Sequence, residues 1–193
     1  MKRVCVYCGS SAGRLPRYRE AARALGHEIA ARGLGLVYGG AGIGVMGAVA
    51  DAVLSRGGEV IGVIPHNLAT KEVAHAGLSE LLVVASMHER KARKEGLSDG
   101  FISLPGGWGT FEEIFEMLTW AQLGMHQKPC GLLNVAGYYD PLFTFLEHAV
   151  AENFVRTEHQ PMMIMEQDPV SLLDRFRDYT APRVRKWLGP DET

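Results

Sequence analysis

With 193 residues, of which 47% are apolar and 22% charged, the chain has material for one well-buried domain over residues 1–193 and little for a second. A formal net charge of −2 gives no broad basic surface, which argues against nucleic acid or an anionic membrane as a partner and favours a small molecule. No apolar run reaches the roughly 20 residues of a membrane-spanning helix, and no signal peptide is recognisable, so we expect a cytoplasmic protein.

The chain alternates between predicted strands and predicted helices. Seven short apolar runs bounded by Gly or Pro predict strands at Arg3–Tyr7, Leu34–Tyr38, Val60–Ile64, Leu81–Ala85, Phe101–Leu104, Cys130–Leu133 and Met162–Met165. Helical spacing follows most of them, at Tyr18–Arg32, Val45–Arg56, Phe111–Leu123, Leu142–Asn153 and Val170–Tyr179. Continuously apolar strands separated by helices predict a doubly wound, Rossmann-like α/β fold, with a parallel sheet of about seven strands covered on both faces. In such folds ligands bind outside the carboxyl ends of the strands.

Neither the cysteines nor the histidines form a pattern typical of a redox or metal site. Three cysteines are an odd number, which fits a reducing compartment better than a disulfide framework. Cys5 and Cys8 form a C-x-x-C, but they lie in a strand-like run rather than at the helix N-terminus that lowers a thiol pKa. The seven histidines are scattered, so we expect no metal site.

Two glycine-rich segments, Gly39–Gly47 and Pro105–Thr110, follow predicted strands and lead into helices. Each can offer backbone N–H groups and a helix N-terminus to a phosphate. The first contains a G-x-G-x-x-G from Gly42 to Gly47, but the next strand ends in Pro65-His66-Asn67 and lacks the acidic residue of a dinucleotide site. Close backbone packing explains one such segment equally well, whereas two of them favour phosphate binding.

The helix after the second segment carries a carboxylate with two competing interpretations. Its predicted sheet-facing side contains Phe111, Ile114, Phe115, Leu118 and Ala121. In one interpretation, Thr110 and Glu113 form a capping box in which Thr110 caps the helix. In the other, Glu113 lies beside a bound phosphorylated substrate and reaches the reacting centre.

A basic stretch, Met87–Lys94, follows another predicted strand. Such runs are usually a solvated helix face. Arg90 is nevertheless suited to fork-like contacts with a phosphate or a base.

The residues now resemble a known family. The segment Pro105–Glu113 matches a P-G-G-x-G-T-x-x-E motif, and Met87–Lys91 matches M-H-x-R-K; both are motifs of the Lonely Guy (LOG) family of cytokinin-activating phosphoribohydrolases. The segments at 5–11, 118–124, 131–134 and 137–139 are similar to the family as well, so the resemblance covers nearly the whole chain.

The resemblance implies hydrolysis of the N-glycosidic bond of a nucleoside 5′-monophosphate, usually an N6-substituted adenosine, without a cofactor. It implies Arg90 and Glu113 as the catalytic pair. The implied substrate-binding residues are Glu72, Arg90, Lys91, Gly106, Gly107, Trp108, Gly109, Thr110, Phe111, Glu112, Glu113 and Thr119. Family members of this length are usually homodimers, and the apolar helix Leu142–Val150 is a candidate for either the interface or the core.

The implied chemistry suits these residue types. Cleavage builds positive charge on the sugar, which a carboxylate such as Glu113 stabilises while it orients the attacking water. Arg90 either neutralises the charge on the departing purine, holds the phosphate or positions Glu113.

Four alternatives stay open. A general AMP nucleosidase would share the fold and the site but ignore the N6 substituent. A lysine decarboxylase, as related proteins are often labelled, would need pyridoxal phosphate on a lysine, for which we find no motif. A molybdenum-cofactor carrier or a nucleotide sensor would bind without chemistry.

Overall fold

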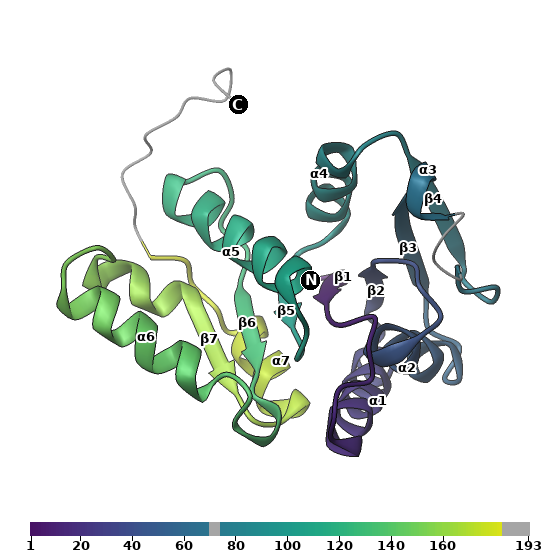
Figure 1. Cartoon of the computed structure of the whole chain (residues 1–193), viewed down its shortest axis with the longest axis horizontal. Helices are drawn as coiled ribbons and strands as arrows, with labels where there is room; N and C mark the ends of the chain where they lie inside the picture. The colour runs from purple at the N-terminus through teal and green to yellow at the C-terminus, as the bar shows by residue number, and fades with distance from the viewer. Residues whose placement is uncertain (70–73, 183–193) are drawn as a thin grey trace.

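A parallel sheet forms the centre of the computed structural model, which describes residues 1–69 and 74–182 and therefore leaves Glu72 outside the described residues. Its seven strands run in the order β4-β3-β2-β1-β5-β6-β7, and every pairing between them is parallel (Figure 1). The strands are β1 (Arg3–Tyr7), β2 (Gly35–Tyr38), β3 (Val60–Pro65), β4 (Glu80–Val84), β5 (Phe101–Ser103), β6 (Cys130–Leu133) and β7 (Met163–Glu166). The predicted fold class is confirmed, and the predicted strand bounds differ from these by one residue at most.

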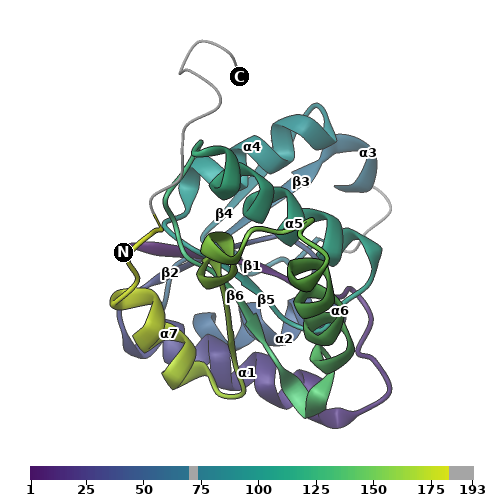
Figure 2. The ribbon, with the colours of Figure 1, turned by 90° about the vertical axis from the view of Figure 1, so that its left-hand side faces the viewer.

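Helices cover both faces of this sheet. They are α1 (Pro16–Ala31), α2 (Gly44–Leu54), α3 (His66–Ala69), α4 (Met87–Leu97), α5 (Trp108–Leu123), α6 (Asp140–Ala151) and α7 (Pro169–Arg177), with short 3₁₀ helices η1 (Val135–Gly137) and η2 (Thr157–Met162). Helices α1, α2 and α7 lie on one face, and α4 and α5 lie on the other (Figure 2). Within the described parts of the chain, no helix has both the length and the apolar character needed to cross a bilayer.

Alternate residues of β1 face the two helical layers, as the two-residue period of a strand requires. Val4, Val6 and the following Cys8 belong to the core cluster under α1, α2 and α7. Cys5 and Tyr7 belong to the cluster under α4 and α5. The two thiols of the C-x-x-C therefore lie on opposite faces of the sheet, which explains why they form no redox pair.

We expect the three thiols to resist modification in the native protein. Cys5, Cys8 and Cys130 are all buried, and burial raises the pKa of Cys5 to about 11 and that of Cys130 to about 12. Because the thiolate is the reactive form, Ellman's reagent at pH 8 should detect almost no thiol before unfolding and three per chain in guanidinium chloride. Rapid reaction of one thiol in the native protein would contradict this placement.

The order of the strands reverses beside β1: β2, β3 and β4 follow one another on one side of it, and β5, β6 and β7 on the other. Strand β1 pairs with β2 on one side, through the crossover α1, and with β5 on the other. The carboxyl ends of β1 and β5 thus mark the topological switch point, where open α/β sheets bind their ligands. The glycine-rich segment Pro105–Thr110 begins two residues after β5 ends, at this point of the sheet.

Candidate functional site

Hydrogen bonds hold the backbone carbonyls at the start of the segment Pro105–Thr110, called the glycine turn below. The carbonyl of Leu104 accepts from the Tyr139 hydroxyl (2.7 Å), and that of Pro105 accepts from the Gly9 amide (3.2 Å). The carbonyl of Gly106 accepts from the Tyr138 hydroxyl (2.5 Å). A planar trans peptide unit directs its N–H opposite to its C=O. These contacts therefore turn the N–H groups of Gly106 and Gly107 outward, as an anion-binding backbone requires.

Helix α5 begins earlier than a capping box allows. Its cap is Gly107, which has no side chain to accept the first amides, and Trp108 is its first helical residue. The expected start of the helix at Thr110 is therefore wrong, and of the two interpretations of Glu113 the capping box does not hold, because Glu113 pairs with Lys94. Thr110 lies within the first turn, where its side chain is buried against Gly106. The first amides of α5 lack an intrahelical acceptor, so the positive end of the helix dipole faces the glycine turn unscreened by a capping side chain.

The sheet-facing side of α5 agrees with the prediction in large part. Of the five predicted residues, Ile114 and Ala121 are buried, and the three others, Phe111, Phe115 and Leu118, are partly buried and pack against the core. Thr110 and Met117 are buried as well. Glu113 lies on the side of α5 that contacts α4.

The other glycine segment, Gly39–Gly47, is not free to bind a phosphate with the amides that begin α2. The carbonyl of Gly9 accepts hydrogen bonds from the amides of Val45 (3.1 Å) and Met46 (3.3 Å). Gly44 has a φ of +64°, and a Cβ there would lie 2.1 Å from the Ser10 carbonyl oxygen. Close packing against the loop after β1 therefore explains why this segment contains glycine. The expectation that its amides are free for a phosphate is wrong for the amides at the start of α2, Val45 and Met46.

Arg90 is held beneath the carboxyl ends of β2 and β3. Its side chain is buried, with Nε donating to the carbonyl of Val63 (2.9 Å) and Nη2 to the carbonyl of Gly39 (3.1 Å). Among residues 1–69 and 74–182, Nη1 has one contact, with the sulfur of Met87 at 3.9 Å. The basic stretch is thus not simply a solvated face: two backbone carbonyls fix the guanidinium, and one of its nitrogens keeps donor capacity.

Ion pairs join α4 to α5. Lys91 contacts Glu112 at 2.6 Å and Glu116 at 2.8 Å, and Lys94 contacts Glu113. Burial lowers the pKa of Lys91, but hydrogen bonds from its ammonium to the two carboxylates outweigh that effect and leave the pKa above its ordinary value. Lys91 and Glu112 therefore form an ion pair with each other in this structure. The same set of ion pairs holds α4, which carries Arg90, against α5, which carries Glu113.

A cavity of about 360 Å³ opens beside the glycine turn, within the size range of small-molecule sites. Its walls are the loop after β1 (Gly9–Gly13), Val45, the turn residues Pro105–Gly107 and the rings of Tyr18 and Tyr138. The two rings meet edge to face, with their centroids 5.8 Å apart. The cavity lies at the switch point between β1 and β5 and is lined by the turn whose amides face outward.

The twelve predicted site residues are not all brought together. Gly106 to Glu113 form the turn and the first two turns of α5, and Arg90 and Lys91 lie on the neighbouring α4. Phe111 packs against the rings of Trp108, Tyr138 and Tyr139. Glu72 lies outside the described residues.

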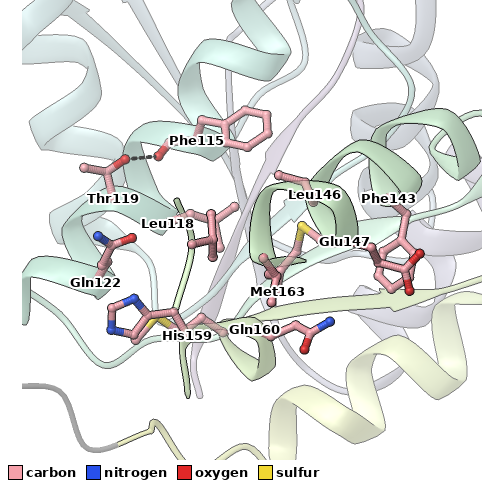
Figure 3. Close-up of a pocket in the computed structure, with 13 residues that line it drawn as sticks. Phe115, Leu118, Thr119, Gln122, Phe143, Leu146, Glu147, His159, Gln160 and Met163 are labelled. Atoms are coloured by element: carbon pink, nitrogen blue, oxygen red, sulfur yellow. Dashed lines mark hydrogen bonds between the residues drawn. The ribbon is translucent and has the colours of Figure 1, made fainter. Parts of the chain in front are cut away.

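Thr119 lies elsewhere, in a groove of about 240 Å³ bordered by α5, α6 and the segment 155–163 (Figure 3). Its hydroxyl donates to the carbonyl of Phe115 at 2.7 Å. The groove, called the α5–α6 groove below, is largely apolar, with Leu118, Phe143 and Leu146 among its lining. Of the predicted site residues, Gly106 and Gly107 line the cavity at the glycine turn, whereas Arg90, Glu113 and Thr119 do not.

Several residues of the site escaped the sequence analysis. The loop Gly9–Gly13 could have been predicted from the sequence, because glycine and serine directly follow the first predicted strand, as in a ligand-binding loop. Lys94 carried one too, since it is four residues after Arg90 and such residues share a helix face. Tyr138 lies in the segment 137–139 that resembles the family, but its contact with Gly106 joins residues 32 positions apart and left no pattern in the sequence.

Comparisons with known proteins show the family of the chain. A family model described as "possible lysine decarboxylase" matches residues 46–176. LOGL9 of Oryza sativa subsp. japonica, named a probable cytokinin riboside 5′-monophosphate phosphoribohydrolase, is 51% identical over 92% of this chain and 78% of its own. LOG1 of Arabidopsis thaliana, named a cytokinin riboside 5′-monophosphate phosphoribohydrolase, is 47% identical over 96% of this chain and 86% of its own.

Solved structures share the fold at lower identity. The molybdenum cofactor binding protein of Rippkaea orientalis superimposes with a TM-score of 0.69 at 23% identity, covering 92% of this chain and 97% of that one. The Moco carrier protein of Chlamydomonas reinhardtii gives a TM-score of 0.68 at 20% identity, covering 92% and 96%. These two matches concern the architecture alone, whereas the curated relatives are about half identical over most of the chain. The chain belongs to the Lonely Guy (LOG) family.

Proposed function

We propose that this protein hydrolyses the N-glycosidic bond of adenosine 5′-monophosphates, above all those with an N6 substituent, to release the free base and ribose 5-phosphate. One observation carries the proposal: a fixed carboxylate, Glu113, and a fixed guanidinium, Arg90, lie on adjoining helices beside a turn whose amides face outward. The names of the curated relatives, which are phosphoribohydrolases of cytokinin riboside 5′-monophosphates, support the same reaction.

In this proposal the phosphate binds at the glycine turn. The N–H groups of Gly106 and Gly107 and the positive end of α5 attract an anion. Glu113 lies five residues after Trp108, about 7.5 Å further along the helix. That rise is comparable to the length of a ribose phosphate, so a phosphate at the turn leaves the anomeric carbon near Glu113.

The reaction then divides between two residues. The bond from C1′ to the base breaks and its electron pair leaves with the base. The hydroxyl of a water adds to C1′, and the remaining proton of that water ends on the departing base, which gives the free base and ribose 5-phosphate. Glu113 stabilises the positive sugar and orients that water. Arg90, through Nη1, stabilises the negative charge on the departing base or contacts the phosphate, while its other nitrogens keep the guanidinium in place.

The test is direct. Purified protein is incubated with AMP, with N6-isopentenyl-AMP and, as a control lacking the phosphate, with N6-isopentenyladenosine, and released base is measured by chromatography. We expect base from the monophosphates and little from the nucleoside, with faster release from the N6-substituted one. Equal rates from the two monophosphates would instead indicate a general AMP nucleosidase. Release from neither, with a pterin bound to the purified protein, would favour a carrier.

We also propose that the protein is a homodimer that pairs through α6 and the α5–α6 groove. No residue of α6 is fully buried, and Phe145 on this helix is 64% exposed. Phe154, just after the helix, is 88% exposed. An apolar helix face beside an apolar groove is a self-complementary surface of the kind that a two-fold dimer uses.

Light scattering after size exclusion tests the pairing. We expect the mass of two 21.1-kDa chains for the wild type and of one chain for Phe145→Asp, because a charge in an apolar contact is costly. Val170→Asp is the matched control, since Val170 is 49% exposed on α7, and it should stay dimeric. A monomeric wild type would refute the proposal.

Among the twelve implied site residues we propose Thr119 as part of this contact region and Glu72 as the acid on the base side of the nucleotide. A cytoplasmic location is proposed on the three unpaired cysteines, which fit a reducing compartment.

A further inference from the structure

We propose that Lys94 is a positioning residue of the site, whose buried ammonium binds Oε1 of Glu113 and thereby fixes the carboxylate that faces the substrate. The inference rests on the role proposed above for Glu113. Lys94 acts through Glu113 and touches no substrate itself.

The burial of Lys94 requires an explanation. Its side chain is 1% exposed, although lysine is almost never fully buried unless it is paired. Removing an ammonium from water is costly, and that cost must be offset by close partners. Its ion-pair partner among the described residues is Glu113, so the buried charge is committed to this one carboxylate.

The sheet anchors the ammonium from the other side. Nζ of Lys94 lies 4.6 Å from the centre of the Tyr7 ring, within the range of a cation–π contact. The Tyr7 ring is in turn stacked on Phe101, with their centroids 6.2 Å apart and their planes 6° apart. The central strands β1 and β5 therefore hold the ammonium in position, and the ammonium holds Glu113.

The pair leaves one oxygen of Glu113 for chemistry. The hydrogen bond from Lys94 goes to Oε1, and Oε2 has no hydrogen bond to the described residues. The Glu113 side chain also keeps 13% of its surface exposed, whereas that of Lys94 keeps 1%. The cation is thus behind the carboxylate, and the free oxygen is on the accessible side.

Other titratable groups near the pair carry no charge at ordinary pH or are already paired. Cys5, Tyr7 and Cys8, on β1 and the residue after it, interact electrostatically with Glu113. Burial raises the pKa of Cys5 to about 11, and it raises the pKa values of Tyr7 and Cys8 well above their ordinary ranges. Lys91 pairs with both Glu112 and Glu116. Removal of the Lys94 charge therefore acts first on Glu113.

The experiment compares Lys94→Met with Lys128→Met. Met keeps the length of the buried side chain and removes its charge. Lys128 is the matched control, because it also binds a partly buried glutamate, Glu95, and lies 5.7 Å from the Phe101 ring centre, but it contacts no proposed site residue. The measurements are kcat and KM for N6-isopentenyl-AMP, with thermal unfolding for each variant.

For Lys94→Met we expect kcat to fall about 10- to 100-fold with KM within about threefold, because the carboxylate that faces the substrate loses the charge that holds it in place. Lys128→Met should keep the kcat of the wild type. Lys94→Arg, which keeps the charge, should recover most of the lost kcat even if it folds less stably. Wild-type kcat in Lys94→Met, or no recovery of kcat in Lys94→Arg, would overturn the positioning role.

Carboxyl ¹³C NMR separates this inference from the proposed function. If the wild type releases no base from any monophosphate, the proposed function fails, and the carboxyl signal of labelled Glu113 at neutral pH still tests the pair. A Glu113 signal that shifts in Lys94→Met but not in Lys128→Met supports the pairing, whereas a signal that is unchanged in Lys94→Met overturns it.

Discussion

Glu113→Gln is expected to lower kcat for nucleotide hydrolysis about a hundred- to a thousandfold, a loss of about 3 to 4 kcal/mol in transition-state stabilisation. The amide has nearly the size of the carboxylate, so packing against α4 should survive. It carries no negative charge, however, and cannot stabilise a positive sugar or pair with the ammonium of Lys94. The measurement is kcat and KM for N6-isopentenyl-AMP, with released base followed by chromatography.

The matched control for this change is Glu95→Gln. Glu95 also pairs with a partly buried lysine, Lys128, but it belongs to the opposite end of α4 from Arg90. This variant should keep the rate of the wild type. Full activity in Glu113→Gln would remove Glu113 from the mechanism and leave it a structural partner of Lys94.

Gly106→Ala is expected to damage both the fold and the site. A Cβ at this position would lie 2.1 Å from Oγ1 and 2.7 Å from Cβ of Thr110, and 2.9 Å from the backbone nitrogen of Gly9. Thr110 is buried and Gly9 N is bonded to the turn, so neither can move aside freely. Overpacking of this kind costs about 1 to 3 kcal/mol, which lowers Tm by about 3 to 10 °C in a chain of this length. We also expect base release to fall at least tenfold, since the outward amides would shift.

Gly107→Ala is the control that distinguishes the steric clash at position 106 from the effect of replacing a glycine as such. No atom lies within 4 Å of a Cβ built on Gly107, and its φ of −105° is open to any residue. Its Tm should stay within about 2 °C of the wild type, as is usual for surface substitutions. Equal melting temperatures for the two variants, measured by scanning calorimetry, would contradict the tight approach of Gly106 to Thr110 and Gly9.

The sequence predicted the sheet well because burial on both faces gives each strand a continuous apolar run. It also located the glycine turn, since few residues other than glycine tolerate so close a backbone approach. The start of α5 was wrong for a physical reason. A capping box is a local pattern, but Thr110 is instead packed against Gly106, and Glu113 finds its partner on α4, 19 residues earlier in the chain.

The interpretation of the β2–α2 segment failed in the same way. Glycine spacing cannot reveal that the carbonyl of Gly9 already accepts the amides of Val45 and Met46. The contact of Tyr138 with Gly106 is likewise set by tertiary structure alone. Local patterns thus predicted which segments meet at the site, and long-range hydrogen bonds decided which of their groups are available to a ligand.

The central place of β1 has a consequence for synthesis of the chain. β1 is made before the other strands of the sheet, and one of its two neighbours, β5, is made about a hundred residues later. Until then one edge of a buried apolar strand has no partner, and unpaired edges of this kind promote association between chains. We therefore expect translational pausing before residue 101, or truncation there, to cause aggregation, so the pace of translation matters most for the strand at the centre of the sheet.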